Sequence, residues 1–371
     1  MQQLTFVKKN TLEWWDVREP SIQTPSEVLV RPFAAARCDL DRTILQGRFP
    51  MFFKIGKFFS LTDTAIPHMF GRHPYKPPFA FGHECVAEVL ACGEGVKNFK
   101  RGDVVIVPFQ ISCGQCLTCH QGLTANCSSV EPFAMYGGIG GKGYNGHWGG
   151  ALSDVVKVPY GDQMLVAVPP GIDPVTLASA SDNLPDAWRT VGPPLKAKPG
   201  APVLVIAGAA KSVGLYATAM AVALGAERVD YLDVNIDRLR LAKLVGANPI
   251  EGSYHYFKGS YPIVVDASNK SEGLRCALSS VAPGGICTSV GIFARKSSPI
   301  PLFKMYVNDV TFKMGVTNAR ANIPEVLSLV QSGRFNPGLL TTNLADWKDA
   351  STAFLESAVK VVVQRDRLFS T

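Results

Sequence analysis

The chain has 371 residues, of which 47% are hydrophobic and 18% are charged, so its length and composition predict about two folded domains and exclude a disordered polymer. Lysine and arginine outnumber aspartate and glutamate by 37 to 30, and no block of five like charges occurs. This mild positive balance favours a soluble protein that attracts small anions over one that binds nucleic acid.

The sequence predicts neither a secretory signal nor a membrane span. Residues 1–15 lack the apolar core and the small-residue cleavage site of a signal peptide. The most apolar long window, residues 201–226, is interrupted by Lys211, Ser212 and several glycines, so a buried strand, turn and helix fit it better than a membrane span. Four of the nine cysteines lie within residues 113–127, which is typical of metal binding in a reducing compartment. We therefore expect a cytoplasmic protein without a membrane or nucleic-acid partner.

The first 150 residues predict short strands and two unusual loops. Strands are clearest at 27–31, 85–90 and 102–107, between glycine, proline and aspartate turns. An aromatic insert between Cys38 and Gly82 includes Phe49, Phe52, Phe53, Phe58, Phe59, Phe70 and Phe79. It is either a subdomain core or oligomer contact, or an apolar wall of a substrate pocket. The glycine-rich stretch 137–150 lacks phosphate-binding spacing and predicts a flexible surface loop.

From Val203 the pattern changes to strands that alternate with helices. The expected strands are 203–206, 228–232, 262–265 and 286–290, and the expected helices end near 224 or span 238–245 and 272–280. This alternation predicts a parallel, doubly wound α/β sheet. The tail, residues 322–371, predicts helices at 324–331 and 347–357 and a last strand at 359–363.

Four cysteines form the most specific pattern in the chain. They are Cys113, Cys116, Cys119 and Cys127, with the spacing Cys-x2-Cys-x2-Cys-x7-Cys. Four thiolates at this spacing can surround one tetrahedral zinc ion. A shell of four cysteines leaves no open coordination position, so this zinc is predicted to be structural.

Cys38 and the stretch Gly82-His83-Glu84 are candidate ligands of a second metal. A single buried cysteine or histidine is more often part of a core. Together with Cys38-Asp-Leu-Asp41 and the four-cysteine stretch, however, they resemble the zinc-dependent medium-chain dehydrogenases, the alcohol dehydrogenase family, over nearly the whole chain. The resemblance implies a GroES-like, mainly β catalytic domain, residues 1–183 with 319–371 returning to it, and a Rossmann NAD-binding domain, residues 184–318.

By this resemblance, Cys38, His83 and Asp182 would bind a catalytic zinc, as in the formaldehyde dehydrogenase branch, where an aspartate is the third ligand. Asp41 would accept the free ring N–H of His83. Glu84 would lie beside the metal and transiently displace a ligand. The alternatives are that Asp182 caps the following helix, and that Asp41 and Glu84 are ordinary polar loop residues.

Two positions depart from the proton relay of the family. Leu40 stands where the family carries serine or threonine, and Thr43 stands where a relay histidine is common. Proton release would then pass through Asp39, Thr43, the cofactor ribose or water. This departure puts the substrate in doubt more than the fold.

The turn after strand 203–206 is Ala207-Gly-Ala-Ala-Lys-Ser-Val-Gly214, which is not a regular G-x-G-x-x-G. Its place between a strand and a helix nevertheless supports dinucleotide binding. It resembles the slightly longer turn of some family members, which implies cofactor contacts at Gly208 and at the amides of Ser212 and Val213. Gly214 would let the helix approach the sheet.

Asp233 ends the next strand, where a carboxylate can bind the ribose hydroxyls of NAD and repel the 2′-phosphate of NADP. Arg238 lies close in sequence and can accommodate that phosphate, so NADP stays an alternative. The alternative for Asp233 itself is a simple turn residue. Val290 is expected to line the nicotinamide side.

These features predict an enzyme with two zinc ions per chain that transfers hydride between an alcohol, or its aldehyde or ketone, and NAD. A polyol or sugar dehydrogenase and an aldehyde dismutase-like enzyme are alternatives on the same scaffold. A noncatalytic zinc-bearing binding protein is the alternative of another class. Membership of the family would imply a homodimer or homotetramer, with an edge strand near residues 290–301 joining cofactor domains.

Overall fold

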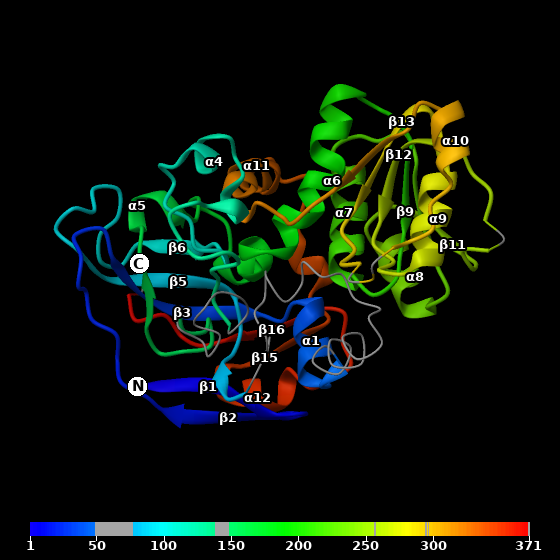
Figure 1. The fold of residues 1–371 in the computed structure, drawn as a ribbon. Helices are drawn as coiled ribbons and strands as arrows, with labels where there is room; N and C mark the ends of the chain where they lie inside the picture. The colour runs from blue at the N-terminus through cyan, green and yellow to red at the C-terminus, as the bar shows by residue number, and fades with distance from the viewer. Residues whose placement is uncertain (49–76, 138–147, 256, 294, 296, 370–371) are drawn as a thin grey trace. The chain divides into compact units, whose positions relative to one another are not determined.

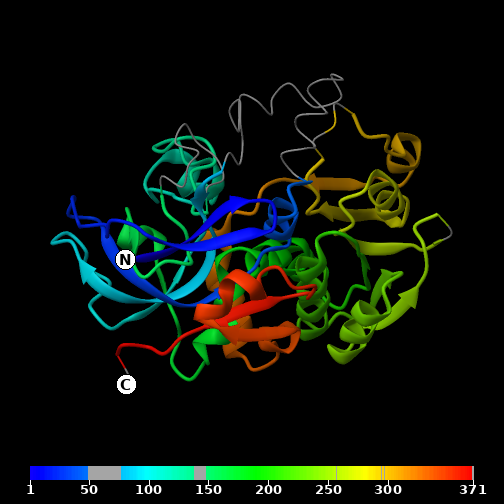
Figure 2. The same ribbon diagram turned by 90° about the horizontal axis from the view of Figure 1, so that it is seen from below.

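A computed structural model describes residues 1–48, 77–137, 148–255, 257–293, 295 and 297–369, which divide into two compact units (Figures 1 and 2). Unit 1 comprises Met1–Asp182, Asn318–Leu327 and Thr341–Thr371, and unit 2 comprises Asn183–Thr317 and Ser328–Leu340. Most of the aromatic insert and most of the glycine-rich stretch lie outside the described residues. Phe79, the last of the phenylalanines named above, is buried in the core of unit 1, where its ring lies tilted against that of Phe6.

Unit 1 is built mainly from strands. They are β1 (Gln2–Lys8), β2 (Thr11–Asp16), β3 (Val28–Ala36), β4 (Phe79–Ala80), β5 (Glu84–Cys92), β6 (Val104–Val107), β7 (Val156–Val158), β8 (Val166–Ala167), β15 (Asn343–Asp346) and β16 (Val361–Gln364). The α-helices are α1 (Asp39–Leu45), α4 (Leu117–His120), α5 (Gly161–Met164), α12 (Ala350–Ala353) and α11 (Ala319–Gln331), whose end belongs to unit 2, and the 3₁₀ helices are η1 (Thr124–Asn126), η2 (Pro174–Ser181) and η4 (Trp347–Asp349).

The main sheet of unit 1 brings two distant parts of the chain together. Within the described residues its order is β15-β16-β3-β5-β6-β8, with β7 also paired to β3, and β2-β1-β4 form a smaller sheet. Cys85, Ala87 and Val89 lie on one face of β5 and pack in the hydrophobic core, and the residues between them are buried as well. The strands β3 and β5 are antiparallel, with Ala36 opposite Glu84. The chain leaving β3 and the chain entering β5 therefore meet at the same edge.

Unit 2 alternates strands with helices. The strands are β9 (Val203–Ile206), β10 (Val229–Asp233), β11 (Asn248–Glu251), β12 (Tyr261–Asp266), β13 (Val281–Ser289) and β14 (Thr311–Met314). The helices are α6 (Asn183–Ala197), α7 (Lys211–Ala223), α8 (Ile236–Leu244), α9 (Ser271–Ser279), α10 (Leu302–Val307) and the 3₁₀ helix η3 (Pro337–Leu340).

The six strands described in unit 2 form one parallel sheet in the order β11-β10-β9-β12-β13-β14. Alternate residues of β9 face opposite sides: Leu204 packs in a cluster with Leu274 of α9, whereas Val205 faces Gly214 of α7. Helices therefore cover both faces, which confirms the expected doubly wound fold (Figure 1). The edge strand expected near 290–301 is wrong for the described residues, because β13 ends at Ser289 and β14 forms the edge.

Across the described part of the chain, none of the helices combines the length and the apolarity that crossing a membrane requires.

Candidate metal centres and cofactor-binding edge

Four buried ligand-type side chains converge in unit 1. Cys38 precedes α1, His83 and Glu84 lie at the start of β5, and Asp182 follows η2. One ligand atom from each lies within 4.8 Å of those of the others. Because β3 and β5 are antiparallel, the end of β3, just before Cys38, lies beside the start of β5, next to His83. The residue before His83 is Gly82, whose φ of +86° is a conformation that glycine adopts without strain. The expected ligands Cys38, His83 and Asp182 are thus brought together.

His83 is oriented by two carboxylates. Its Nε2 atom lies 3.4 Å from Oδ2 of Asp182, and its Nδ1 atom lies 3.4 Å from Oδ1 of Asp41. Asp41 is itself fixed, because its Oδ2 accepts the backbone N–H of Cys38 at 3.0 Å. Burial alone would lower the pKa of His83, but Asp41 and Asp182 offset this and raise that pKa well above its usual value. Nε2 therefore faces the cluster and Nδ1 faces Asp41, the orientation in which a ring nitrogen binds a metal.

Sequence reasoning missed Lys360, which the structure places beside Glu84. The ammonium group of Lys360 donates to Oε2 of Glu84 at 2.7 Å and to the carbonyl oxygen of Arg37 at 3.0 Å, and both charged side chains are 0% exposed. Oε1 of Glu84 is buried and has no hydrogen-bond partner among the described residues. A lysine within the apolar run 359–363 was the available signal, since lysine is seldom fully buried unless it is paired.

Leu40 and Thr43 both lie on α1 and are half-buried. Leu40, named above as a departure from the proton relay of the family, packs against the hydrophobic core of unit 1. Asp39 begins the same helix.

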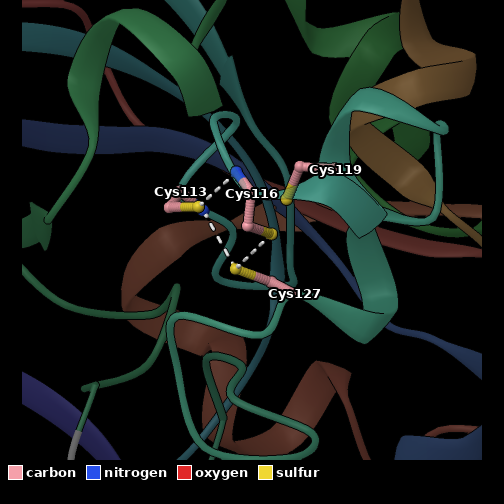
Figure 3. Close-up of side chains that lie close together, drawn as sticks. All are labelled: Cys113, Cys116, Cys119 and Cys127. Atoms are coloured by element: carbon pink, nitrogen blue, oxygen red, sulfur yellow. Dashed lines mark hydrogen bonds between the residues drawn. The ribbon is translucent and has the colours of Figure 1, made fainter.

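The four clustered cysteines also converge, as Figure 3 shows. Their sulfur atoms lie within 4.8 Å of one another, and all four are unpaired thiols. The backbone amides of Gln115 and Cys116 donate to Sγ of Cys113 at 3.4 Å, and that of Cys113 donates to Sγ of Cys127 at 3.3 Å. Hydrogen bonds from the Ser128 and Thr118 hydroxyls lower the pKa of Cys116 to about 4. Amides and hydroxyls favour the thiolates of Cys113 and Cys116, whereas burial raises the pKa of Cys119 and of Cys127. Four converging sulfur atoms fit a tetrahedral zinc ion.

The turn between β9 and α7 is shaped by two glycines. A Cβ atom at Gly208 would lie 2.5 Å from the backbone oxygen of Ser268, and one at Gly214 would lie 3.1 Å from Cβ of Ala267. Ser212 and Val213 lie in the first turn of α7, and the hydroxyl of Ser212 donates to Asn183 at 2.8 Å. A turn that lacks side chains at these two positions and leads into a helix N-terminus fits a pyrophosphate group.

Asp233 ends β10 at the carboxyl edge of the sheet, but its carboxylate is already bonded. It accepts two hydrogen bonds from Arg238, at 2.6 and 2.7 Å, and the backbone amides of Val234 and Asn235 at 2.7 and 3.0 Å. The side chain of Asp233 is only 2% exposed. Val290 follows β13 directly and donates its backbone N–H to Asp266. The sequence placed Asp233 and Arg238 near each other but did not predict that they pair.

Two family comparisons cover most of the chain. Residues 24–170 match the family described as the alcohol dehydrogenase GroES-like domain, and residues 212–332 match the family described as zinc-binding dehydrogenase.

Individual relatives agree with these matches. A probable zinc-binding alcohol dehydrogenase of Mycobacterium tuberculosis is 30% identical over 74% of this chain and 70% of its own length. A glutathione-independent formaldehyde dehydrogenase of Pseudomonas aeruginosa is 39% identical over 47% of this chain and 44% of its own length. Among solved structures, the alcohol dehydrogenase of Thermus sp. ATN1 superposes with a TM-score of 0.81 at 27% identity, covering 98% of this chain and 99% of that one.

Proposed function

Because the chain belongs to the zinc-dependent medium-chain dehydrogenase family, we propose that it transfers hydride between an alcohol, or the corresponding aldehyde or ketone, and NAD. The observation that supports this most directly is the convergence of Cys38, His83 and Asp182 in one buried cluster. Zinc would supply Lewis acidity there, and the nicotinamide would take or give the hydride. We assign the catalytic role to unit 1 and cofactor binding to unit 2.

Each proposed ligand contributes through its charge or its orientation. The Cys38 thiolate and the Asp182 carboxylate together balance the charge of a divalent cation, while His83 binds as a neutral imidazole whose second nitrogen faces Asp41. We propose Asp182 as the third ligand, with Glu84 as the alternative, because Lys360 holds only one oxygen of Glu84. Three protein ligands leave one position for a substrate oxygen, whereas the four-cysteine set leaves none and suits a structural zinc.

For the cofactor we favour NAD over NADP. Asp233 is the carboxylate at the ribose end of the sheet edge, and a 2′-phosphate would meet its negative charge. The paired Arg238 weakens that repulsion, so we expect a preference for NAD that is measurable but not absolute.

One alternative has a specific observation behind it. Similarity to formaldehyde dehydrogenase, together with an aspartate at position 182, favours an aldehyde-oxidising or dismutase-like variant as the second candidate. A screen of alcohols and aldehydes, with and without added NAD, separates the two candidates, because a dismutase turns over aldehyde without net NADH.

We further propose a homodimer or homotetramer in a reducing, cytosolic compartment. Cys38 and the four clustered cysteines are candidate metal ligands, and thiolate ligands suit such a compartment. The edge strand β14 and the neighbouring helix α10 carry an apolar surface whose residues are strongly exposed: Leu302, Phe303, Tyr306, Val307 and Met314. A second copy could extend the sheet at this edge and cover these side chains, which suits the closed symmetry of most oligomers.

The decisive experiment replaces His83 with alanine. Turnover should fall by at least about 1000-fold, because a lost ligand removes the Lewis acid, while the affinity for NAD should stay nearly unchanged. The zinc content should fall from two ions to one per chain. The matched control is His255→Ala, which removes an exposed histidine from unit 2. Retained activity in His83→Ala would contradict the metal assignment, and one zinc per chain in the unchanged protein would favour a noncatalytic role.

A further inference from the structure

Helix α6 carries a partly buried ion pair that neither metal centre uses. Oδ1 of Asp186 accepts a hydrogen bond from Nε of Arg189 at 2.6 Å, one helical turn away. Nη2 of Arg189 also donates to the backbone oxygen of Ser289 at 3.3 Å. The Arg189 side chain is 9% exposed and that of Asp186 is 16% exposed. Both side chains are held in place and remain partly accessible to a ligand.

The pair lies at the carboxyl edge of the parallel sheet of unit 2. Ser289 is the last residue of β13, and β13 runs parallel to β12 and β9. At the same end of α6, the first residue of the helix, Asn183, accepts a hydrogen bond from Ser212 in the first turn of α7. Ligands of doubly wound sheets bind outside the carboxyl ends of the strands. The Asp186–Arg189 pair therefore lies at the ligand-binding edge, next to Ser289, the residue before Val290.

We propose that Asp186 and Arg189 set the relative affinity of this protein for NAD+ and NADH. This inference rests on the proposed function, because it takes the cofactor to be a nicotinamide dinucleotide. The oxidised ring carries a formal positive charge and the reduced ring carries none. The Asp186 carboxylate therefore favours the oxidised form, and the Arg189 guanidinium opposes it. Anchoring of Arg189 to Ser289 keeps both charges at fixed distances from the ring.

The test measures dissociation constants of NAD+ and NADH separately, by titration of the zinc-loaded full chain. Asp186→Asn keeps the size of the side chain but removes the negative charge, so the ratio of the NAD+ constant to the NADH constant should rise about tenfold. Arg189→Gln removes the positive charge, so the same ratio should fall about tenfold. Arg189→Lys keeps the charge and should leave the ratio within about twofold of the unchanged protein.

Asp237→Asn is the matched control, because Asp237 forms an Asp–Arg pair of the same spacing with Arg240 on α8, where both side chains are 74% exposed. Asp237→Asn should leave the ratio unchanged, since the adenosine half of the cofactor is identical in both forms.

Opposite shifts in the two charge-removing variants support the proposal, because loss of a purely structural pair would change both affinities by the same factor. Equal changes for NAD+ and NADH, or shifts of the same sign in both variants, overturn it. If Asp186→Asn does not fold, Asp186→Ser carries the same test. If the unchanged protein binds neither nucleotide, the proposed function fails. A protein that binds both nucleotides with unshifted ratios refutes only the role of the pair.

Discussion

The buried pair of Lys360 and Glu84 joins strand β16 to the edge of the metal cluster. Burial raises the pKa of Glu84, and the charge of Lys360 opposes this rise. Both side chains are fully buried, so neither charge has water to stabilise it if the other is removed.

We therefore predict that Lys360→Met lowers the free energy of unfolding by about 3–5 kcal/mol, because the Glu84 carboxylate is left buried beside a second carboxylate. Adding Glu84→Gln should recover part of this loss, since the uncompensated charge disappears. Denaturant unfolding of the zinc-loaded protein measures both values. The control is Lys348→Met, which breaks an ion pair whose side chains are 78% and 71% exposed and should change stability by less than about 0.5 kcal/mol. Similar losses for Lys360→Met and Lys348→Met would contradict the argument.

At the residue scale, the sequence alone identified individual ligand types, and the resemblance supplied their grouping. Asp182 became a candidate only because of its position relative to the cofactor half. The pairs Lys360–Glu84 and Asp233–Arg238 were not predicted, because the first joins residues 276 positions apart and the second needs side-chain geometry. The sequence shows a lysine within the apolar run 359–363 and an arginine five residues after Asp233, but it identifies no partner for either.

Among the elements, the turn from β9 to α7 depends on close backbone packing. The β12–α9 connection passes so near that a Cβ atom at Gly208 would lie 2.5 Å from both Cα and the oxygen of Ser268. Neither atom belongs to a flexible side chain that could move away.

We predict that Gly208→Ala lowers the unfolding free energy by about 2 kcal/mol, because the backbone of one of the two segments must shift. Gly315→Ala is the matched control in the same unit: no atom lies within 4 Å of its added Cβ, and it should be neutral or slightly stabilising. Thermal unfolding of both variants gives the comparison. Equal melting temperatures would show that the turn can relax.

The periodicity predicted elements well where their own residues decide the structure. Residues 203–206 match β9 without change, and 262–265 lie within β12. Other boundaries depend on contacts between distant residues. Helix α11 begins at Ala319, five residues before the predicted start, and the backbone amide of Ala319 bonds to Gln110. The helix predicted at 347–357 is instead η4 followed by the single turn α12.

For the whole molecule, the proposed oligomer makes a simple prediction. Phe303 and Tyr306 on α10 are 80% and 84% exposed, which is unusual for neighbouring aromatic side chains. Replacing both with glutamate should reduce the molar mass measured by light scattering to that of one chain, because buried like charges would separate the copies. Leu344→Glu, at a 53% exposed position on the edge strand β15, should leave the mass unchanged. An unchanged molar mass in the double variant of Phe303 and Tyr306 would show that the oligomer interface lies elsewhere.

The fold class followed from strand and helix alternation in unit 2, whereas the β-rich unit 1 depended on the resemblance. Short strands with irregular spacing are compatible with many different strand orders, so they do not determine the sheet. The pairing of Ala36 with Glu84, which joins Cys38 to His83, is a tertiary fact that no local pattern encodes.

The order β15-β16-β3 has a consequence for synthesis on the ribosome, because β16 is one of the last strands translated yet lies inside its sheet. Between Cys92 and Val361 the nascent chain grows by 269 residues, which takes roughly 13–54 s at ~5–20 residues per second. Throughout that interval Ala34–Ala36 of β3 lack the strand that pairs with them opposite β5, while β7 can already pair with Val28–Val30 and the contiguous β9–β14 sheet can already form. A chaperone that shields open strand edges would therefore assist this half of the protein most.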